Sequence, residues 1–357
     1  MQEPGAGAGQ QAATAEGMSA LSEPASYRPA AHPPTTRRLA ADVAGIAEAA
    51  RVLRAGGLVA LPTETVYGLA CDATDPVAVA RLYAAKGRPS FNPLIAHVAD
   101  IEAARRVGDF SPEALALASR FWPGPLTLVV PAIPEATSEL ARAGHSSVAI
   151  RVPAHEVARA VLAAAGRPIA APSANRSGHV SPTTAEHVLA DLDGAIDLVL
   201  DAGPCAVGIE STILDCTVSP PALLRPGGLA REEIEQVLGA KLARRATPQG
   251  KADDLIAPGM MASHYAPSVP VRLDAHEVLP GEALLTFSGA RPAGSGRAVA
   301  VLDLSPEGDL IEAAARLFAH LRALDAAGAS GIAVVPLPRE GLGEGIRDRL
   351  ERAAAPR

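Results

Sequence analysis

The sequence predicts an α/β protein, and three observations support that fold class. Short apolar runs alternate with stretches of helical period, which is the pattern of a sheet covered by helices. Hydrophobic residues make up 48% of the 357 residues, enough to bury sizeable cores. Polar turns follow several apolar runs, as they do where strands end at the edge of a sheet. We expect a twisted open sheet in a larger first domain and a smaller, Rossmann-like α/β domain at the C-terminus.

The composition excludes several classes of protein. A net charge of -7 argues against a protein that coats nucleic acid nonspecifically, because such binding depends on neutralising phosphates. The three cysteines, Cys71, Cys205 and Cys216, are widely spaced, which predicts neither disulfides nor a zinc site and favours a reduced, cytoplasmic setting. No apolar run is long enough to span a membrane, and the N-terminus lacks the apolar segment of a secretory signal. Residues 1–37 are expected to form a disordered tail, in which Met18 is an alternative start.

The strands of the first domain, residues 38–240, are expected where apolar runs are short and bounded by turns. They are predicted at 57–62, 94–98, 126–130, 148–152, 198–200 and 212–214. Within 148–152, the Val and Ile residues alternate with Ala149 and Arg151. Successive side chains of a strand point to opposite faces, so Arg151 should face away from the apolar side.

Helices of the first domain are expected from capping signals and apolar period. Thr74-Asp75-Pro76 reads as a helix start and Gly87 as a left-handed C-terminal cap. The spacing of Thr183 and Glu186 predicts a capping box that opens a helix toward Leu192. Further helices are expected at 101–107 and 112–120 and around Ile234, Val237 and Leu238.

The chain changes character after residue 240. Residues 241–269 carry basic residues, Pro and Gly without periodicity, which predicts a linker between domains. The second domain, 270–357, should contain strands at 283–287, 298–302 and 332–335. A long amphipathic helix is expected at 310–326.

Two polar segments of the first domain are candidates for ligand binding by their residue types. The turn 62–68 places Thr63, Glu64 and Thr65 directly after a strand, where hydroxyls can hold a small polar ligand or merely cap the turn. The segment 86–93 combines Lys86, Arg88 and Asn92 with two prolines that limit its flexibility. A point charge beside a planar guanidinium suits phosphate, although a lysine at this position can also complement a helix C-terminus.

Two further segments repeat the pattern of a strand followed by polar residues. Arg151 lies in a strand between apolar neighbours and therefore needs a partner, either the carboxylate of an amino-acid ligand or a structural ion pair. The segment 171–178, followed by Ser181, is rich in small residues and hydroxyls that permit close approach of a ligand, or it is an ordinary loop with a helix cap. The segments 208–212 and 224–228 also join a strand to a polar turn.

The sequence carries no signature of covalent catalysis, zinc binding or a P-loop. The sequence shows no Ser/His/Asp catalytic triad in recognisable surroundings. The histidines lack the spacing of a zinc site, and the P-loop motif GxxxxGK[ST] is missing. The residue types alone therefore indicate an α/β enzyme with a Lys/Arg anion site, without identifying its substrate.

Read in order, the motifs resemble those of the threonylcarbamoyl-AMP synthase family in its long, two-domain form. The matching stretches are LPTETVYGLACDA, YAAKGRPSFNPLIAHV, SVAIRVPAH, PIAAPSANRSGHVSPTTAEHV, GIESTILD, LLRPGG, APGMMASHYAP and GLGEGIRDRL. Several linked motifs in one order are far more specific than any one alone. The resemblance implies a catalytic first domain with a large, positively lined cavity, and a cytoplasmic enzyme.

The resemblance also implies substrates and residue roles. L-Threonine, bicarbonate or CO2, and ATP would yield threonylcarbamoyl-AMP and pyrophosphate, with Mg2+ carried by ATP and no metal bound by the protein itself. A separate transferase would pass the threonylcarbamoyl group to tRNA, and direct contact with this partly double-stranded RNA stays open. By position, Thr65, His97, Arg151, Ala171 and Ser211 resemble threonine contacts. The positions that resemble ATP contacts are Arg88, Asn92, Ser147, Ser173, Ser181, Arg225 and Tyr265, while Lys86 and Arg88 resemble catalytic residues.

Three other interpretations predict different behaviour. An RNA-binding module is disfavoured by the acidic net charge and by an aromatic content of only 3%, since base stacking usually needs aromatic rings. A carbamoyl-transfer enzyme of hydrogenase maturation would carry additional zinc-finger-like and acylphosphatase-like parts. An ATP-binding regulator would leave Thr65, His97 and Arg151 unexplained. Among these residues, Tyr265 falls in the predicted linker, which we expect to act as a lid over the ligands.

Overall fold

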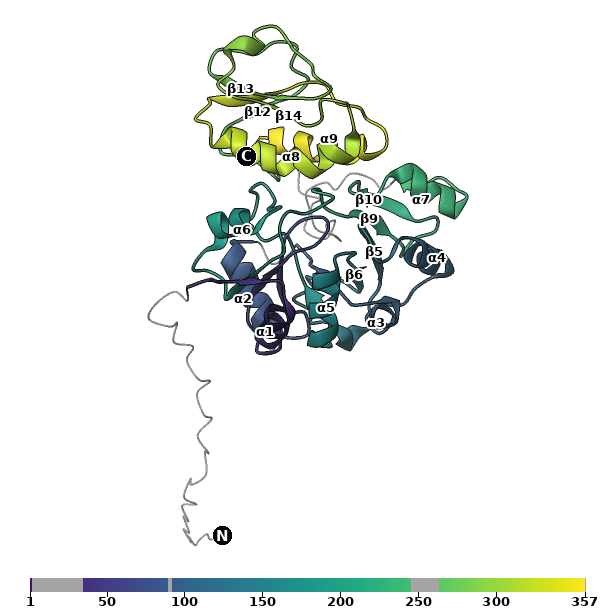
Figure 1. The fold of residues 1–357 in the computed structure, drawn as a ribbon. Coiled ribbons are helices and arrows are strands. Elements are labelled where there is room, and N and C mark those ends of the chain that lie inside the picture. Colours follow the sequence, from purple (N-terminus) through teal and green to yellow (C-terminus); the bar gives the residue numbers. More distant parts are fainter. Residues whose placement is uncertain (2–34, 89–91, 245–262, 357) are drawn as a thin grey trace. The chain divides into compact units, whose positions relative to one another are not determined.

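A computed structural model describes residue 1 and residues 35–88, 92–244 and 263–356 (Figure 1). Most of the predicted tail and residues 245–262 of the predicted linker lie outside these described residues. Among these described residues, the first strand is Arg37–Ala40, which pairs in parallel with Leu198–Asp201.

The larger sheet is 11-stranded over the described residues, and it mixes parallel and antiparallel neighbours. Its order is β1-β8-β2-β3-β7-β4-β6-β5-β9-β10-β11. The strands are β1 (Arg37–Ala40), β2 (Val59–Leu61), β3 (Gly68–Asp72), β4 (Ile95–His97), β5 (Leu126–Pro131), β6 (Ser147–Arg151), β7 (Ile169–Ala170), β8 (Leu198–Asp201), β9 (Thr212–Asp215), β10 (Ala222–Arg225) and β11 (Ala243–Arg244). All six predicted strands of the first domain are confirmed within one or two residues, and the last strand, β11, lies inside the predicted linker.

Five of the seven described helices of the first domain lie where they were predicted, whereas α1 (Val43–Arg54) and α5 (Glu156–Ala165) were not predicted. The five predicted helices are α2 (Pro76–Lys86), α3 (Ile101–Arg105), α4 (Pro112–Phe121), α6 (Ala185–Leu192) and α7 (Arg231–Leu238). Asp75 caps α2, and Gly87 ends it at a φ of 59°, as predicted. The capping box predicted at Thr183 is wrong by one residue, because the Thr184 side chain accepts from the backbone N–H of His187 and is the N-cap of α6.

Small aliphatic residues fill the cores of this domain, as the low aromatic content requires. One cluster joins α1 and α5 to the strands through Ala49, Leu53, Val161 and Leu162. A second cluster lies under α2 and α6, and a third under α4 and α7. No helix among the described residues is both long and apolar enough to cross a membrane.

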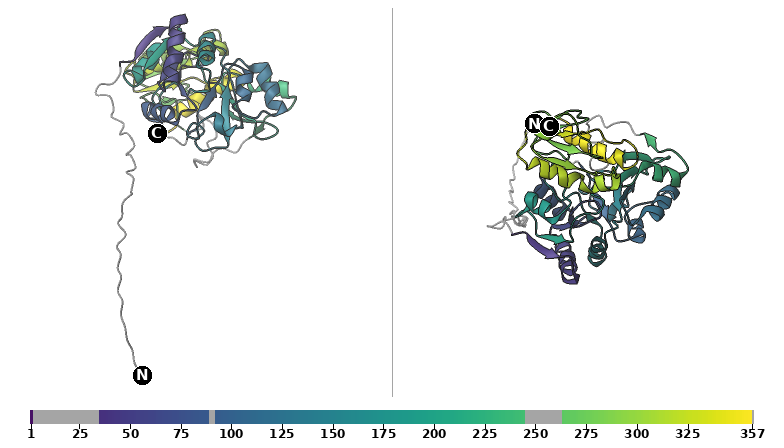
Figure 2. Two further views of the ribbon diagram at one scale, coloured as in Figure 1. Left: turned by 90° about the horizontal axis from the view of Figure 1, so that it is seen from below. Right: turned by 45° about the horizontal axis from the view of Figure 1, so that its top comes forward.

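The second domain is confirmed as an α/β unit with a four-stranded parallel sheet. The strands β12 (Val271–Arg272), β13 (Glu282–Thr286), β14 (Val301–Asp303) and β15 (Gly331–Val334) are ordered β12-β15-β13-β14. Figure 1 shows α8 (Leu310–Asp325) and α9 (Leu342–Ala354) on the same side of this sheet. The right-hand view of Figure 2 shows the two helices running side by side. The helix predicted at 310–326 is therefore confirmed, whereas α9 was not predicted.

Candidate active site

The centre of the site is formed by the ends of two neighbouring parallel strands. His97 ends β4, Arg151 ends β6, and the two residues are direct register partners. The Arg151 guanidinium donates to the Glu64 carboxylate with an Nη2–Oε1 distance of 2.6 Å, and both side chains are buried. Burial raises the pKa of Glu64, but the charge and the hydrogen bond of Arg151, together with backbone hydrogen bonds, hold that pKa below its ordinary value. Of the two partners considered for Arg151, the structural ion pair is the one present here.

His97 is a neutral side chain in this environment. Burial, reinforced by the positive charge of Arg151, lowers the pKa of His97 to about 3. Its Nδ1 lies 3.2 Å from the backbone oxygen of Ile95. A carbonyl oxygen only accepts, so Nδ1 carries the proton and Nε2 is an acceptor. The imidazole can therefore receive a hydrogen bond from a ligand at neutral pH.

Lys86 connects the end of α2 to a distant loop rather than to its own helix. Its Nζ donates to the backbone oxygens of Ser173 and Asn175, at 2.5 Å each. This geometry differs from the alternative in which the lysine complements the helix C-terminus. Burial and the nearby charge of Arg88 lower the pKa of Lys86 well below its ordinary value.

Arg88 and Arg225 hold backbone oxygens at two other points of the site. The Arg88 guanidinium donates to the oxygen of Pro93 at 3.0 Å, and burial lowers the pKa of Arg88 to about 10. Arg225, at the end of β10, donates to the oxygen of Ser211 at 2.8 Å. These contacts fix two guanidinium groups in a buried setting where charge–ligand interactions are strong.

Hydroxyl groups of the site are bound to one another or to a carboxylate. Thr65 Oγ1 lies 2.9 Å from Thr63 Oγ1, and Ser211 Oγ lies 2.7 Å from Thr127 Oγ1. Ser181 Oγ donates to Glu210 Oε1 at 2.5 Å.

A single pocket collects most of the side chains predicted from the sequence. Its lining residues are Val66, Arg88, Ile95, His97, Arg151, Ala171, Pro172, Ser173, Glu210, Ser211, Arg225, His264 and Tyr265. Lys86 and Ser181 lie behind this surface, through their contacts with Ser173 and Glu210. Ser147 stands apart: it begins the strand that Arg151 ends, which separates the two by about 13 Å. Thr65 and Asn92 are buried beside the pocket without lining it.

Five lining residues were not named as site residues by sequence reasoning. Val66, Ile95 and Pro172 supply apolar walls next to predicted residues, and Glu210 and His264 directly precede Ser211 and Tyr265. The signal that could have found Glu210 is its place in the polar segment 208–212, although nothing local predicts that its partner lies in the second domain.

Tyr265 and His264 close the pocket from the described end of the predicted linker. Tyr265 is buried, has a φ of 61°, stacks on Phe318 of α8 and lies edge-on to His264. Burial, together with the charges of Arg88, Lys86 and Arg225, lowers the pKa of His264 well below its ordinary value. Those charges reach His264 from two segments, 86–93 and the end of β10, so positive charge converges on this side of the pocket.

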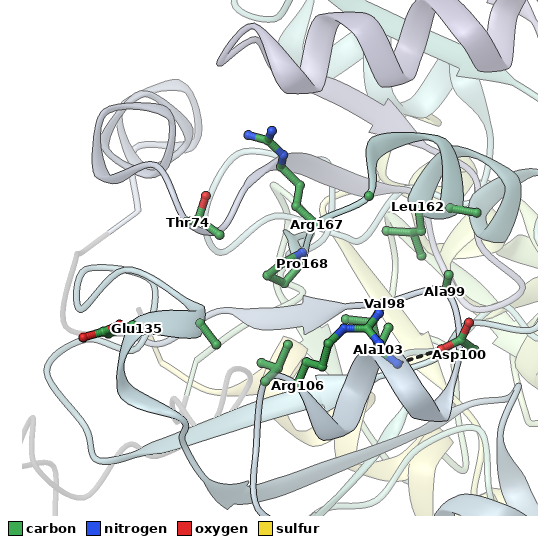
Figure 3. A pocket seen from close by; sticks show the side chains of 14 residues that line it. Thr74, Val98, Ala99, Asp100, Ala103, Arg106, Glu135, Leu162, Arg167 and Pro168 are labelled. Carbon is green, nitrogen blue, oxygen red and sulfur yellow. Dashed lines mark hydrogen bonds between the residues drawn. The ribbon is translucent and has the colours of Figure 1, made fainter.

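A larger hollow lies elsewhere on the first domain and contains none of the predicted residues. It has a volume of about 470 Å3 and is lined by residues of α3 and α5 and of the loops around Thr74 and Glu135. Figure 3 shows the side chains of Arg106 and Arg167 there. Arg167 forms an ion pair with Asp72 at 2.5 Å. No group of three or more potential metal-ligating side chains occurs in the part of the chain that the structure describes.

The fold is that of an α/β protein, and buried arginines line its pocket. Two family models match the chain: "Telomere recombination" over residues 51–227 and "Threonylcarbamoyl-AMP synthase, C-terminal domain" over residues 229–355. The chain belongs to the threonylcarbamoyl-AMP synthase family, which confirms the resemblance found in the motifs.

Individual relatives match along most of their length. The threonylcarbamoyl-AMP synthase of Bacillus subtilis is 42% identical, over 87% of this chain and 93% of the relative. That of Pyrococcus abyssi is 44% identical, over 86% of this chain and 93% of the relative. The crystal structure of Pyrococcus abyssi Sua5 complexed with L-threonine superposes with a TM-score of 0.79 at 39% identity, covering 89% of this chain and 97% of that one.

Proposed function

We propose that this chain joins L-threonine, bicarbonate and ATP into threonylcarbamoyl-AMP, with pyrophosphate as the second product. The observation that carries the proposal is the pairing, in one buried pocket, of a neutral His97 beside Arg151 with a second group of cations at Arg88 and Arg225. The first pair suits a zwitterionic amino acid, and the second suits phosphates. Similarity to a relative solved with L-threonine supports the same assignment.

The reaction requires positioning and charge stabilisation more than covalent catalysis. The threonine nitrogen forms a bond to the carbon of bicarbonate, and loss of water leaves a carbamate. A carbamate oxygen then bonds to the α-phosphorus of ATP while the bond from that phosphorus to the bridging oxygen breaks, releasing pyrophosphate. Negative charge spreads over phosphate oxygens in such a transition state, so fixed cations can supply most of the stabilisation. The lack of an obvious nucleophile in the sequence is consistent with this chemistry.

The threonine end of the pocket is assigned to the strand ends. Arg151 would bind the carboxylate while it remains close to Glu64, and Nε2 of His97 would accept a hydrogen bond from the ligand. Thr65, Ser211 and the backbone of Ala171 would complete this end. A pocket that pairs the threonine hydroxyl can reject valine strongly, whereas it gains only about 1–3 kcal/mol from the methyl group that serine lacks.

The ATP end of the pocket is assigned to the cations of segment 86–93 and of the end of β10. Arg88 and Arg225 would contact phosphate oxygens, with Lys86 near the phosphate or the carbamate. The remaining proposed contacts are Asn92, Ser147, Ser173, Ser181 and Tyr265. Because Mg2+ binds nucleotide phosphates readily, it would enter as MgATP. These groups would make a large, positively lined cavity once His264 and Tyr265 move away from the pocket.

The linker would act as a lid over this cavity. His264 and Tyr265 already line the pocket, and Tyr265 reaches it from a segment that continues into the second domain. Closing over the ligands would exclude water from the adenylate. We further propose that a tRNA threonylcarbamoyl transferase consumes the product in the cytoplasm.

The test is pyrophosphate release from MgATP by the purified chain, with L-threonine and bicarbonate each added or omitted. Release should require both, and mass spectrometry should find threonylcarbamoyl-AMP. Serine should support slow release and valine almost none. Equal rates with valine would refute the threonine assignment, and no release under any condition would refute the activity.

A further inference from the structure

Arg349 of α9 is a wholly buried arginine that reaches from the second domain into the first. None of its surface is exposed. Its Nε donates to Glu210 Oε2 at 2.9 Å, and its Nη1 donates to the backbone oxygen of Pro226 at 2.5 Å. Nη1 also lies 2.9 Å from the neighbouring Asp348 carboxylate. A buried guanidinium is costly unless it is fully paired, so these contacts define one arrangement of the two domains.

Glu210 is shared between Arg349 and a residue of the proposed nucleotide site. Its second oxygen accepts from the Ser181 hydroxyl at 2.5 Å, and its side chain lines the pocket. Burial raises the pKa of Glu210, but Arg349 and, after it, Arg225 hold that pKa below its ordinary value. Glu210 is therefore an anion facing two arginines, of which Arg349 makes the direct hydrogen bond.

Arg349 also contacts the two other parts of the nucleotide end. Pro226 directly follows Arg225, so the hydrogen bond from Arg349 to the Pro226 oxygen fixes the backbone next to the end of β10. The guanidinium carbon lies 5.4 Å from the ring centroid of Tyr265, within the range of a cation–π contact. One side chain thus touches the carboxylate, the loop and the aromatic residue that surround this part of the pocket.

Close packing keeps α9 seated against the same loop. A Cβ added to Gly345 of α9 would lie 2.9 Å from the oxygen of Gly227, and one added to Gly227 would lie 2.3 Å from the oxygen of Glu210. Both spacings are too short for real atoms, so only glycine permits this approach. The first contact seats α9 directly against the loop that follows β10, and the second seats that loop against Glu210.

We propose that Arg349 is a positioning residue of the nucleotide site, which the second domain thereby completes. The inference rests on the proposed function. By pairing with Glu210, Arg349 prevents that carboxylate from turning to Arg225, where it would compete with a phosphate. It also fixes the Ser181 hydroxyl and the ring of Tyr265. Loss of Arg349 should weaken ATP binding selectively and leave threonine binding at the strand ends nearly unchanged.

The test compares Arg349→Met, the double variant Glu210→Gln/Arg349→Met and the control Arg347→Met in the full-length chain. Arg347 lies on the same helix, but it pairs with Asp274 and Glu351 and touches no part of the pocket. For Arg349→Met, KM for ATP should rise about tenfold or more, which corresponds to one charge-assisted hydrogen bond, and KM for threonine should change less than about twofold. The double variant should recover much of the ATP affinity, because an uncharged glutamine no longer competes for Arg225. The control should match the unmodified chain.

Two readouts separate this inference from a general loss of structure. Without Arg349 the pKa of Glu210 rises, so KM for ATP in Arg349→Met should fall again as the pH is lowered toward 5, whereas the unmodified chain should lack this feature. If Arg349→Met does not fold, the same comparison is made with Glu210→Gln/Arg349→Met and Arg349→Lys, of which the lysine variant should keep part of the ATP affinity. Equal rises in both KM values, or no change in either, would overturn the inference. Absence of threonine-dependent release from the unmodified chain would instead overturn the proposed function.

Discussion

The ion pair between Arg151 and Glu64 gives the most direct test of the site's energetics. Replacing Arg151 by methionine leaves the Glu64 carboxylate buried without its partner. Removing one partner of a buried pair typically costs about 3–5 kcal/mol, because the remaining charge is neither solvated nor paired. The double variant Glu64→Gln/Arg151→Met removes both charges and should recover more than half of that loss. Arg142→Met is the matched control, since Arg142 is buried but donates to the backbone oxygens of His145 and Pro134.

The measurement is urea unfolding of the four proteins at pH 7, together with threonine-dependent pyrophosphate release. Stability and activity should separate: the double variant should regain more than half of the lost stability yet should bind threonine poorly, because the carboxylate of threonine loses its cation. Arg142→Met should lose less stability and keep its threonine KM. A loss below about 1 kcal/mol for Arg151→Met, or no recovery in the double variant, would refute the reasoning.

Three further predictions concern single residues. Lys86→Met should lower turnover by about 100-fold, as expected when one fixed donor to a developing charge is removed, and a drop of less than about fivefold would contradict its role. Because the pKa of His97 falls from 6.5 to about 3 on folding, the unfolded chain takes up this proton first. The contribution of His97 to the free energy of unfolding is fully present above pH 6.5 and should decline by about 1.4 kcal/mol per pH unit below it. His97→Asn should remove this contribution to the pH dependence measured by urea unfolding. Gly208→Ala should destabilise the chain by about 2–4 kcal/mol in the same assay, because Gly208 has a φ of 76° and an added Cβ would lie 2.4 Å from the Cα of Ala315 in α8; an unchanged midpoint would contradict the packing.

The sequence predicted the elements whose signals are local. The strand β5 is a run of apolar residues between turns. The helix α2 is flanked directly by its capping residues, Asp75 and Gly87. The strand β3 was missed because it begins with a glycine and ends with an aspartate, which leaves an apolar run of only three residues. The strand β7 was missed because it has two residues, too few for any period to be visible.

The candidate site was predicted in its residue types more than in its connections. Its cations and hydroxyls follow strands, so their gathering at one pocket could be anticipated from sheet geometry. The partner of Arg151 lies 87 residues away and that of Arg349 lies 139 residues away, distances over which no spacing rule applies. Those pairings depend on the order of the strands and on how α9 meets the first domain, which only the folded chain defines.

The register between β4 and β6 has a consequence for how this protein can change its sequence. His97 and Arg151 lie opposite each other, while Val148 and Ile150 of the same strand belong to the apolar core on the other face. Inserting or deleting one residue inside β6 would exchange these faces, placing the guanidinium in the core and a valine or isoleucine in the pocket. Length variation among descendants of this chain should therefore accumulate in surface loops, whereas the short strands that carry the site should keep their residue count even where their side chains are replaced.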